Sequence, residues 1–162
     1  MKNSFQTKAW WSFLGGDLQE LLGESQKLLQ EASSWQTTFH DYSFIVFPAA
    51  KAYEGFLKKV FLNLGFISEE DYFGNRFRIG KALNPSLDPK YKDENVYEKV
   101  VKFCEGKNLA DEMWNAWKLC RNQVFHWFPN EKNNLTYSQA GERIALIIKT
   151  MDDTFKGCKI KR

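Results

Sequence analysis

The stretch YSFIVFPAAKAYEGFLKKVFLNLG, residues 42–65, decides the fold of this 162-residue chain. Its large apolar side chains fall on both faces of a helix, as the positions of Phe44, Phe47, Tyr53, Phe56, Val60 and Phe61 show. A helix that is apolar all round lies inside a protein. Pro48 can occupy a first helical turn, and Gly65 is suited to end the helix. The stretch therefore predicts a central helix.

The rest of the chain has the periodicity of helices that pack around such a centre. Apolar residues recur every three or four positions in four further segments, which are residues 7–31, 95–106, 109–128 and 137–158. The first of these has a weak point at Gly15-Gly16, because glycine disfavours a helix interior. No segment shows the alternating pattern of a strand. These patterns predict an all-α protein, a bundle of four to six helices.

Residues 66–95 form the least regular region, which we expect to be an irregular insertion in a single domain of residues 1–162. Because long structureless loops are unusual in small domains, we expect at least one short helix here, within NRFRIGKAL, residues 75–83. The basic tail, residues 157–162, is expected to be frayed.

The composition limits the classes of protein to which the chain can belong. With 43% hydrophobic residues it can bury a full core, and a net charge of +3 is compatible with a polyanionic partner without requiring one. No run of apolar residues is long enough to span a membrane, and the N-terminus lacks the apolar core of a signal peptide. We therefore expect a cytoplasmic protein with no membrane contact.

The cysteines and histidines give no sign of a metal or a disulfide framework. Cys104, Cys120 and Cys158 are odd in number and widely spaced, which argues against a disulfide framework or a zinc knuckle and suits a reducing cytosol. His40, one of only two histidines, reads as a turn or capping residue beside Asp41. We expect no metal and no cofactor.

A second stretch, RNQVFHWFPNEKNN at residues 121–134, raises the question of function. Arg121 and His126 near the end of a helix are ordinary stabilising choices, because the helix dipole favours cations there, and Asn122 can be a surface residue. The same residue types also suit metal-free RNA cleavage. Histidine can move protons near neutral pH, and arginine can hold the phosphate and the charge that develops on it. A homodimer would bring two of each residue together.

The two stretches together resemble the HEPN superfamily. RNQVFH fits its R-x(4–6)-H motif, and PAAKAYEGFLKKVFLNLGFI is similar to the central helix of the C-terminal HEPN domain of RnlA-type toxins, the RNase LS group. The resemblance implies a helical bundle that works as a dimer with its two motifs facing each other. It also implies a metal-independent endoribonuclease of a toxin–antitoxin or anti-phage defence system, with RNA as substrate and an antitoxin as a possible protein partner.

The resemblance also implies roles for individual residues. His126 would act as general base or acid in attack by the 2′-hydroxyl, which leaves a 2′,3′-cyclic phosphate and a 5′-hydroxyl. Arg121 would bind the phosphate, Asn122 would orient the histidine or the phosphate, and Glu54 would position Arg121 or assist proton transfer. The bland alternative for Glu54 is a surface carboxylate that pairs with Lys58.

Further residues are candidates for binding RNA. Arg76, Arg78 and Lys81 could contact phosphates, although a solvated loop explains them equally well. Trp127 could stack on a base, and core or dimer contacts are its alternative. The competing function for the whole chain is a non-catalytic HEPN-like binding module that uses the same bundle to hold a protein or a nucleotide ligand.

Overall fold

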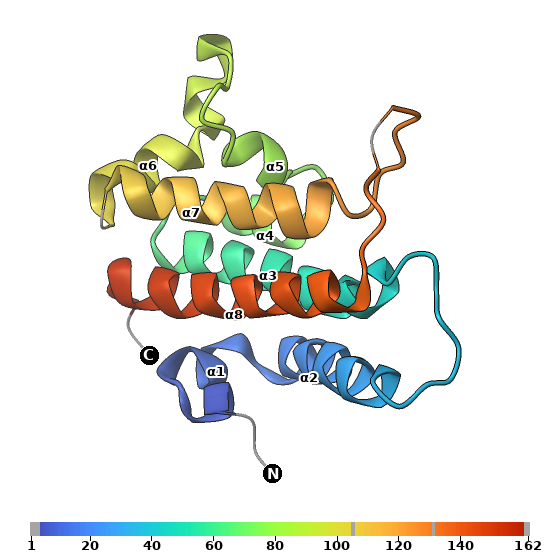
Figure 1. The fold of residues 1–162 in the computed structure, drawn as a ribbon. Coiled ribbons are helices and arrows are strands. Elements are labelled where there is room, and N and C mark those ends of the chain that lie inside the picture. Colours follow the sequence, from blue (N-terminus) through green and yellow to red (C-terminus); the bar gives the residue numbers. More distant parts are fainter. Residues whose placement is uncertain (1–3, 105, 131, 161–162) are drawn as a thin grey trace.

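The structure, a computed structural model, describes residues 4–104, 106–130 and 132–160, and within these residues it confirms the all-α fold. In Figure 1, α8 crosses the front of the bundle with α3 behind it, α6 and α7 on one side, and α1 and α2 on the other. The α-helices are α1 (Ala9–Leu14), α2 (Gly16–Ala32), α3 (Ser43–Asn63), α4 (Glu69–Phe73), α5 (Ile79–Ala82), α6 (Val96–Phe103), α7 (Lys107–Trp117) and α8 (Tyr137–Gly157). Short turns of 3₁₀-helix are η1 (Ser4–Thr7) and η2 (Pro89–Glu94), and η3 (Lys118–Asn122) is a turn of π-helix.

The central helix of the sequence prediction is α3, which packs mainly against α2 and α8. Tyr53, Phe56 and Phe61 are fully buried along it. Phe44 and Phe47 differ from the prediction, because they remain 40% and 49% exposed. The N-terminal part of α3 therefore extends past the core and carries aromatic rings to the surface.

Pro48 lies inside α3 rather than in its first turn, because the helix begins five residues earlier at Ser43. A proline inside a helix has no N–H to donate to the preceding turn. A polar side chain from a neighbouring helix can be inserted at such a point to bond the backbone groups. The hydroxyl of Ser25, fully buried on α2, donates to the carbonyl of Ile45 at 2.7 Å and accepts from the N–H of Ala49 at 2.8 Å. Ser25 thus satisfies backbone groups beside the proline and joins α2 to α3.

Glycine ends two helices as the sequence predicts. Gly15 has φ of 81° and separates α1 from α2, which confirms the expected break. The ammonium group of Lys59 on α3 donates to the last two carbonyls of α1, those of Phe13 at 2.6 Å and Leu14 at 2.8 Å. Gly65 has φ of 69° at the end of α3, where the N–H of Phe66 donates to a carbonyl of the last turn.

The irregular region contains short helices only. The expected helix within residues 75–83 is α5, and a capping box formed by Ser68 and Asp71 starts α4. Because α5 lies so close to Trp117 of α7, a Cβ atom on Gly80 would approach the indole nitrogen to 2.7 Å. The insertion is therefore packed onto the end of α7 that leads to the candidate site.

The helix expected over residues 109–128 ends earlier than its apolar pattern suggests. The π-turn η3 follows α7, with the N–H of Gln123 donating to the carbonyl of Lys118 at 2.9 Å, and His126 lies beyond the last turn. The segment that joins this point to α8 projects from the bundle at the same end as residues 33–42 (Figure 1). A backbone hydrogen bond of 2.9 Å from Tyr42 to Leu135 ties the two segments together.

The cysteines correct another expectation, because Cys104 and Cys158 form a disulfide between the ends of α6 and α8. They are 54 residues apart in sequence, and only the packing of the two helix ends brings their Cα atoms to 4.3 Å. The tail expected to be frayed includes this disulfide and Ile160, which is 8% exposed, while residues 161 and 162 lie outside the described residues. None of the described helices is long and apolar enough to cross a membrane.

Candidate functional site

Glu54 and Arg121 meet across α3 and the π-turn η3. The Nε atom of Arg121 lies 3.9 Å from Oε2 of Glu54. The side chain of Arg121 is 39% exposed and that of Glu54 is 34% exposed. At that distance they form a loose ion pair rather than a hydrogen bond. The guanidinium of Arg121 also lies 5.3 Å from the ring centre of Trp117, within the range of a cation–π contact.

The π-turn itself is anchored by Cys120, which is fully buried directly before Arg121. Its Sγ atom donates to the carbonyl of Arg143 on α8 at 3.5 Å, and burial raises the pKa of the thiol to about 12. A π-turn inserts an extra residue into a helix and so changes the direction of the side chains that follow. The combination directs Arg121 toward α3, where Glu54 lies.

Arg121 and Glu54 line a hollow of about 420 Å³, which we call the carboxylate hollow. Its other lining residues are Phe47, Ala50, Lys51 and Phe125. Within it Arg121 and Lys51 supply two cations and Glu54 one anion. A hollow that contains a second cation and a guanidinium with N–H donors still available suits a phosphate group.

His126 lies in a neighbouring hollow of about 450 Å³, which we call the aromatic hollow. Its lining residues are Asp41, Ser43, Phe44, Phe47, Val124, Phe125, His126, Trp127, Asn133 and Asn134. The imidazole is exposed, and its ring centre is 6.1 Å from that of Phe128. The backbone carbonyl of His126 accepts a hydrogen bond of 3.2 Å from Nδ2 of Asn133, which fixes the start of the projecting segment.

The two hollows share a wall. Phe47 and Phe125 line both of them, and their rings meet edge to face with centres 5.2 Å apart. Within one chain, Arg121 and His126 therefore lie in adjoining hollows and not in the same one. Groups that bind both hollows at once must pass over this pair of rings.

Asn122 is exposed at the end of the π-turn. Its four-residue separation from His126 would place both on one helix face, but the helix ends between them. Among the described residues, no hydrogen bond joins the side chain of Asn122 to the histidine. The structure thus brings together Glu54 and Arg121, and leaves Asn122 apart from His126.

The proposed RNA-binding residues are in different situations. Arg76 is exposed, and Arg78 donates to the carbonyls of Asn75 and Phe77 beside α5. Lys81 forms an ion pair of 2.7 Å with Glu94 and lies 3.8 Å from the ring centre of Tyr91, so its charge is already matched.

Trp127 is 81% exposed and lines the aromatic hollow beside His126. Arg76 and Arg78 lie just before α5, which packs against Trp117, the same indole that lies against the guanidinium of Arg121. Arg76 and Trp127 are thus the members of this group whose side chains are open to a ligand.

Sequence reasoning missed the polar edge of the aromatic hollow. Asn134 Nδ2 lies 2.6 Å from Nε2 of His40, and Asn133 bonds the backbone of His126. Oδ1 of Asp41 accepts hydrogen bonds from the N–H and hydroxyl of Ser43 and from the N–H of Leu135. Two adjacent amides in a polar loop next to the histidine were the available signal.

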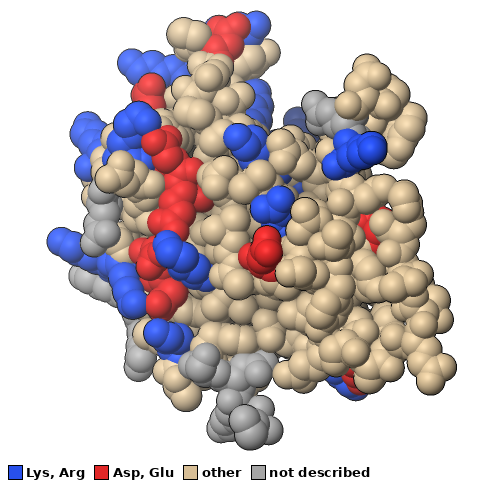
Figure 2. Space-filling model, viewed as in Figure 1, with Lys and Arg blue, Asp and Glu red and all other residues tan. Residues whose placement is uncertain are grey.

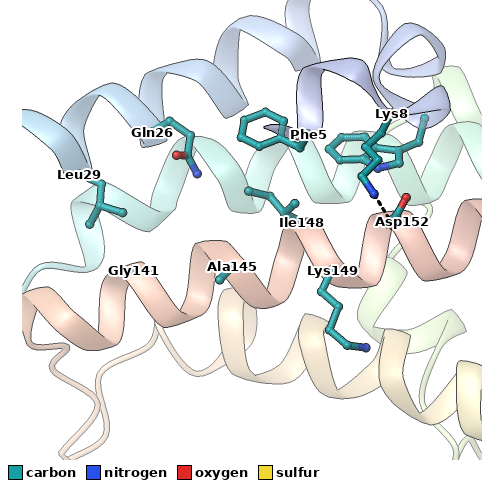
Figure 3. A pocket seen from close by; sticks show the side chains of 10 residues that line it. Phe5, Lys8, Gln26, Leu29, Gly141, Ala145, Ile148, Lys149 and Asp152 are labelled. Carbon is teal, nitrogen blue, oxygen red and sulfur yellow. Dashed lines mark hydrogen bonds and ion pairs between the residues drawn. The ribbon is translucent and has the colours of Figure 1, made fainter. Parts of the chain in front are cut away.

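A third hollow, of about 490 Å³, lies between η1, α1, α2 and α8 (Figure 3). Lys8 and Asp152 close one end of it with a contact of 3.5 Å, and Asp152 also binds Lys156 at 2.7 Å. Lys149 binds Asp153 at 2.5 Å and also binds Glu112. These hydrogen bonds raise the pKa of Lys149.

We call the six residues of these ion pairs the charged edge, which consists of Lys8, Glu112, Lys149, Asp152, Asp153 and Lys156. Partial burial acts to raise the pKa of Asp152, but its hydrogen bonds and ion pairs with Lys156 and Lys8 lower it overall. Every member of the charged edge has an opposite charge beside it, which leaves little charge for a ligand. Among the residues that the structure describes, no group of three histidine, cysteine or acidic side chains could hold a metal ion.

Comparison with known proteins gives one result. Residues 12–86 match the family model described as RnaseLS-like HEPN. The match includes α3 with Glu54 and ends before the π-turn that carries Arg121. No curated protein and no solved structure matches the chain.

Proposed function

We propose that this chain, whose residues 12–86 match the RnaseLS-like HEPN family model, is a metal-independent endoribonuclease of a toxin–antitoxin or anti-phage defence system. Its substrate is RNA in the cytoplasm, and an antitoxin protein is its expected regulator. The observation that carries the proposal is the position of exposed His126 in a hollow that adjoins the Glu54–Arg121 pair.

The chemistry needs only groups that this chain supplies. His126 takes the proton from the 2′-hydroxyl, and the 2′-oxygen attacks the adjacent phosphorus. The bond from phosphorus to the 5′-oxygen breaks, and a protonated imidazole gives its proton to that oxygen. The products are a 2′,3′-cyclic phosphate and a 5′-hydroxyl, and no metal or water enters this step.

Arg121 binds the phosphate and stabilises the negative charge that develops on its oxygens. Glu54 acts as a positioning residue, because its loose 3.9 Å contact keeps the guanidinium near α3 and leaves its donors open to a phosphate. Asn122, exposed beside Arg121, contacts the phosphate rather than the imidazole. Arg76 and Trp127, whose side chains are open, hold the RNA beside the site, whereas Arg78 and Lys81 would have to leave their partners in the chain to join them.

A second copy of the chain completes the site. One exposed histidine must otherwise serve as both base and acid, and in a single chain it is separated from Arg121 by the Phe47–Phe125 wall. A twofold axis near these hollows would place two histidines and two arginines around one phosphate. On dilution, we expect the cleavage activity to fall faster than the protein concentration. We also expect analytical ultracentrifugation to show a dimer.

The proposal is tested with single-stranded RNA in EDTA. Purified protein is expected to cleave it and to leave 2′,3′-cyclic phosphate ends. A matched RNA with a 2′-deoxy nucleotide at the cleavage position should resist cleavage there, because it lacks the nucleophile. Cleavage of the 2′-deoxy RNA at that position would refute the mechanism. RNA binding without any cleavage would instead support the non-catalytic binding module.

A further inference from the structure

We propose that the aromatic hollow is a base-recognition pocket for an unpaired nucleotide next to the scissile phosphate, and that it prefers guanine to uracil. This inference rests on the proposed function and adds a sequence preference to it. It concerns the walls and the polar edge of the hollow, and not the groups that carry out the cleavage.

The walls of the hollow suit a flat ring. Phe44, Phe47, Phe125 and Trp127 line it, and three of them are at least 40% exposed. Phe47 and Phe125 support each other edge to face, so that their rings are held in place without a ligand. Unpaired bases bind proteins by stacking on such aromatic side chains, and every base has a face that can do so. The walls therefore select for an unpaired base but do not choose among bases.

The polar edge of the hollow can discriminate among bases. Oδ1 of Asp41 accepts three hydrogen bonds from the protein, and Oδ2 has no partner among the described residues. Asn133 donates through Nδ2 to the carbonyl of His126. Because a carbonyl can only accept, this bond fixes the orientation of the amide and leaves Oδ1 of Asn133 as a second acceptor without a partner in the described chain. The edge therefore includes two acceptors, Asp41 Oδ2 and Asn133 Oδ1, that have no partner in the described chain.

Two acceptors match the edge of guanine. Guanine presents N1–H and its 2-amino group side by side, which are two neighbouring donors. Uracil presents one N–H between two carbonyl oxygens, so it offers these two acceptors one donor in place of two. A site built for hydrogen bonds discriminates strongly against a ligand that leaves its polar groups unpaired.

The same feature argues against an apolar protein surface as the occupant of this hollow, so a second copy that completes the cleavage site would lie beside the hollow and not in it. An apolar protein surface placed here would bury Asp41 Oδ2 and Asn133 Oδ1 without donors, which costs free energy. A ligand that brings donors on a flat ring satisfies both the walls and the edge. Position also favours a nucleotide, because His126 lines the same hollow and Arg121 lies behind the shared wall.

The test uses single-stranded RNAs that differ at one position beside the mapped cleavage site. We expect kcat/KM for guanine to exceed that for uracil by about tenfold or more. Replacing the guanine with inosine removes only the 2-amino group and should lose most of this advantage. Equal rates for guanine, inosine and uracil at every position near the cleavage site would overturn the proposal, whatever any protein variant does.

The protein-side test is Asp41→Asn, which keeps the shape and Oδ1 but replaces the free acceptor with a donor. The preference for guanine over uracil should fall by about tenfold, with the melting temperature as a check on folding. Trp127→Ala should weaken the binding of the guanine, inosine and uracil RNAs alike, while Phe73→Ala, a matched control 78% exposed on α4, should change nothing. The pocket would be refuted if Asp41→Asn left the ratio of the guanine and uracil rates unchanged. It would also be refuted if Phe44→Ala abolished the dimer without changing RNA binding, because the hollow would then hold a second copy of the chain.

Failure of this inference can be told apart from failure of the proposed function. Cleavage by the wild type with no base preference refutes the pocket and leaves the ribonuclease. If no RNA is cleaved, fluorescence anisotropy with the same guanine and uracil RNAs still measures the preference of the hollow. Equal binding of the two in that case refutes the pocket as well.

Discussion

The charged edge and the Glu54–Arg121–His126 region differ in how their charges are matched. At the charged edge, each lysine and carboxylate lies within hydrogen-bond or ion-pair distance of an opposite charge, and Figure 2 shows acidic and basic side chains interleaved over α7 and α8. In the other region, the charged partner of Arg121 is Glu54 at 3.9 Å, and His126 has no charged partner among the described residues. The first arrangement stabilises a fold, and the second leaves groups open to a substrate.

Removal of the Arg121 guanidinium should give the largest difference between the two regions in its effect on RNA cleavage. Arg121→Ala is expected to lower kcat/KM for RNA cleavage by about 100-fold or more, because the phosphate loses the charge that stabilises its transition state. The melting temperature should change little, since the side chain is 39% exposed and loosely paired. Lys149→Ala, which removes a cation from the charged edge, is the matched control and should leave cleavage unchanged.

A smaller effect is expected at Glu54. Glu54→Gln should lower kcat roughly 10- to 100-fold and leave KM almost unchanged, because the guanidinium is still present but less well placed. Glu20→Gln on α2, also an exposed glutamate, is the control and should have no effect. An equal loss in both variants, or a loss confined to KM, would contradict a positioning role for Glu54.

The disulfide should affect stability but not cleavage. It joins the ends of α6 and α8, and neither Cys104 nor Cys158 lines the carboxylate or the aromatic hollow. The double variant Cys104→Ser/Cys158→Ser is expected to lose about 2–4 kcal/mol in the free energy of unfolding, as urea denaturation would measure. Cleavage at 25 °C should stay within about twofold of the wild type. A large loss of cleavage in a folded variant would link the disulfide to the site.

The smallest effect is the pH dependence of the charged edge. The pKa of Asp152 is lowered in the folded state, so its contribution to stability is present above the unfolded value of about 3.9 and is lost as the pH falls through the folded value. Asp152→Asn should therefore unfold with a shallower dependence on pH between about 5 and 3. The difference should shrink in high salt, because the partners are exposed. No difference between the variant and the wild type would show that these pairs are unimportant.

The sequence located most of the helices because their signals are local, although the helix expected over residues 109–128 ends earlier. The all-round apolar pattern of residues 42–65 identified the central helix, and the glycines at 15 and 65 marked breaks that their positive φ angles confirm. The exposure of Phe44 and Phe47 could not be read from that pattern, because periodicity does not tell where neighbouring helices stop covering a face. Those two rings also line the aromatic hollow, together with Phe125 and Trp127.

The candidate site was predictable as a set of residues but not as a shape. Glu54 and Arg121 were expected together and lie 3.9 Å apart, yet the π-turn and the early end of the helix moved His126 into a separate hollow. A π-turn depends on how Cys120 packs against α8, which is a tertiary effect with no signal in spacing. The pairing of Cys104 with Cys158 was missed for the same reason.

The most direct test of the ribonuclease assignment is cleavage of single-stranded RNA in EDTA by His126→Ala beside the wild type, purified in parallel. The variant should keep the circular dichroism spectrum and melting temperature of the wild type, because the imidazole is exposed and its ring centre lies 6.1 Å from that of Phe128. We expect its cleavage rate to fall by about 100-fold or more, since proton transfer by a placed histidine supplies at least that factor. A folded His126→Ala protein that cleaves RNA at the wild-type rate would contradict the account.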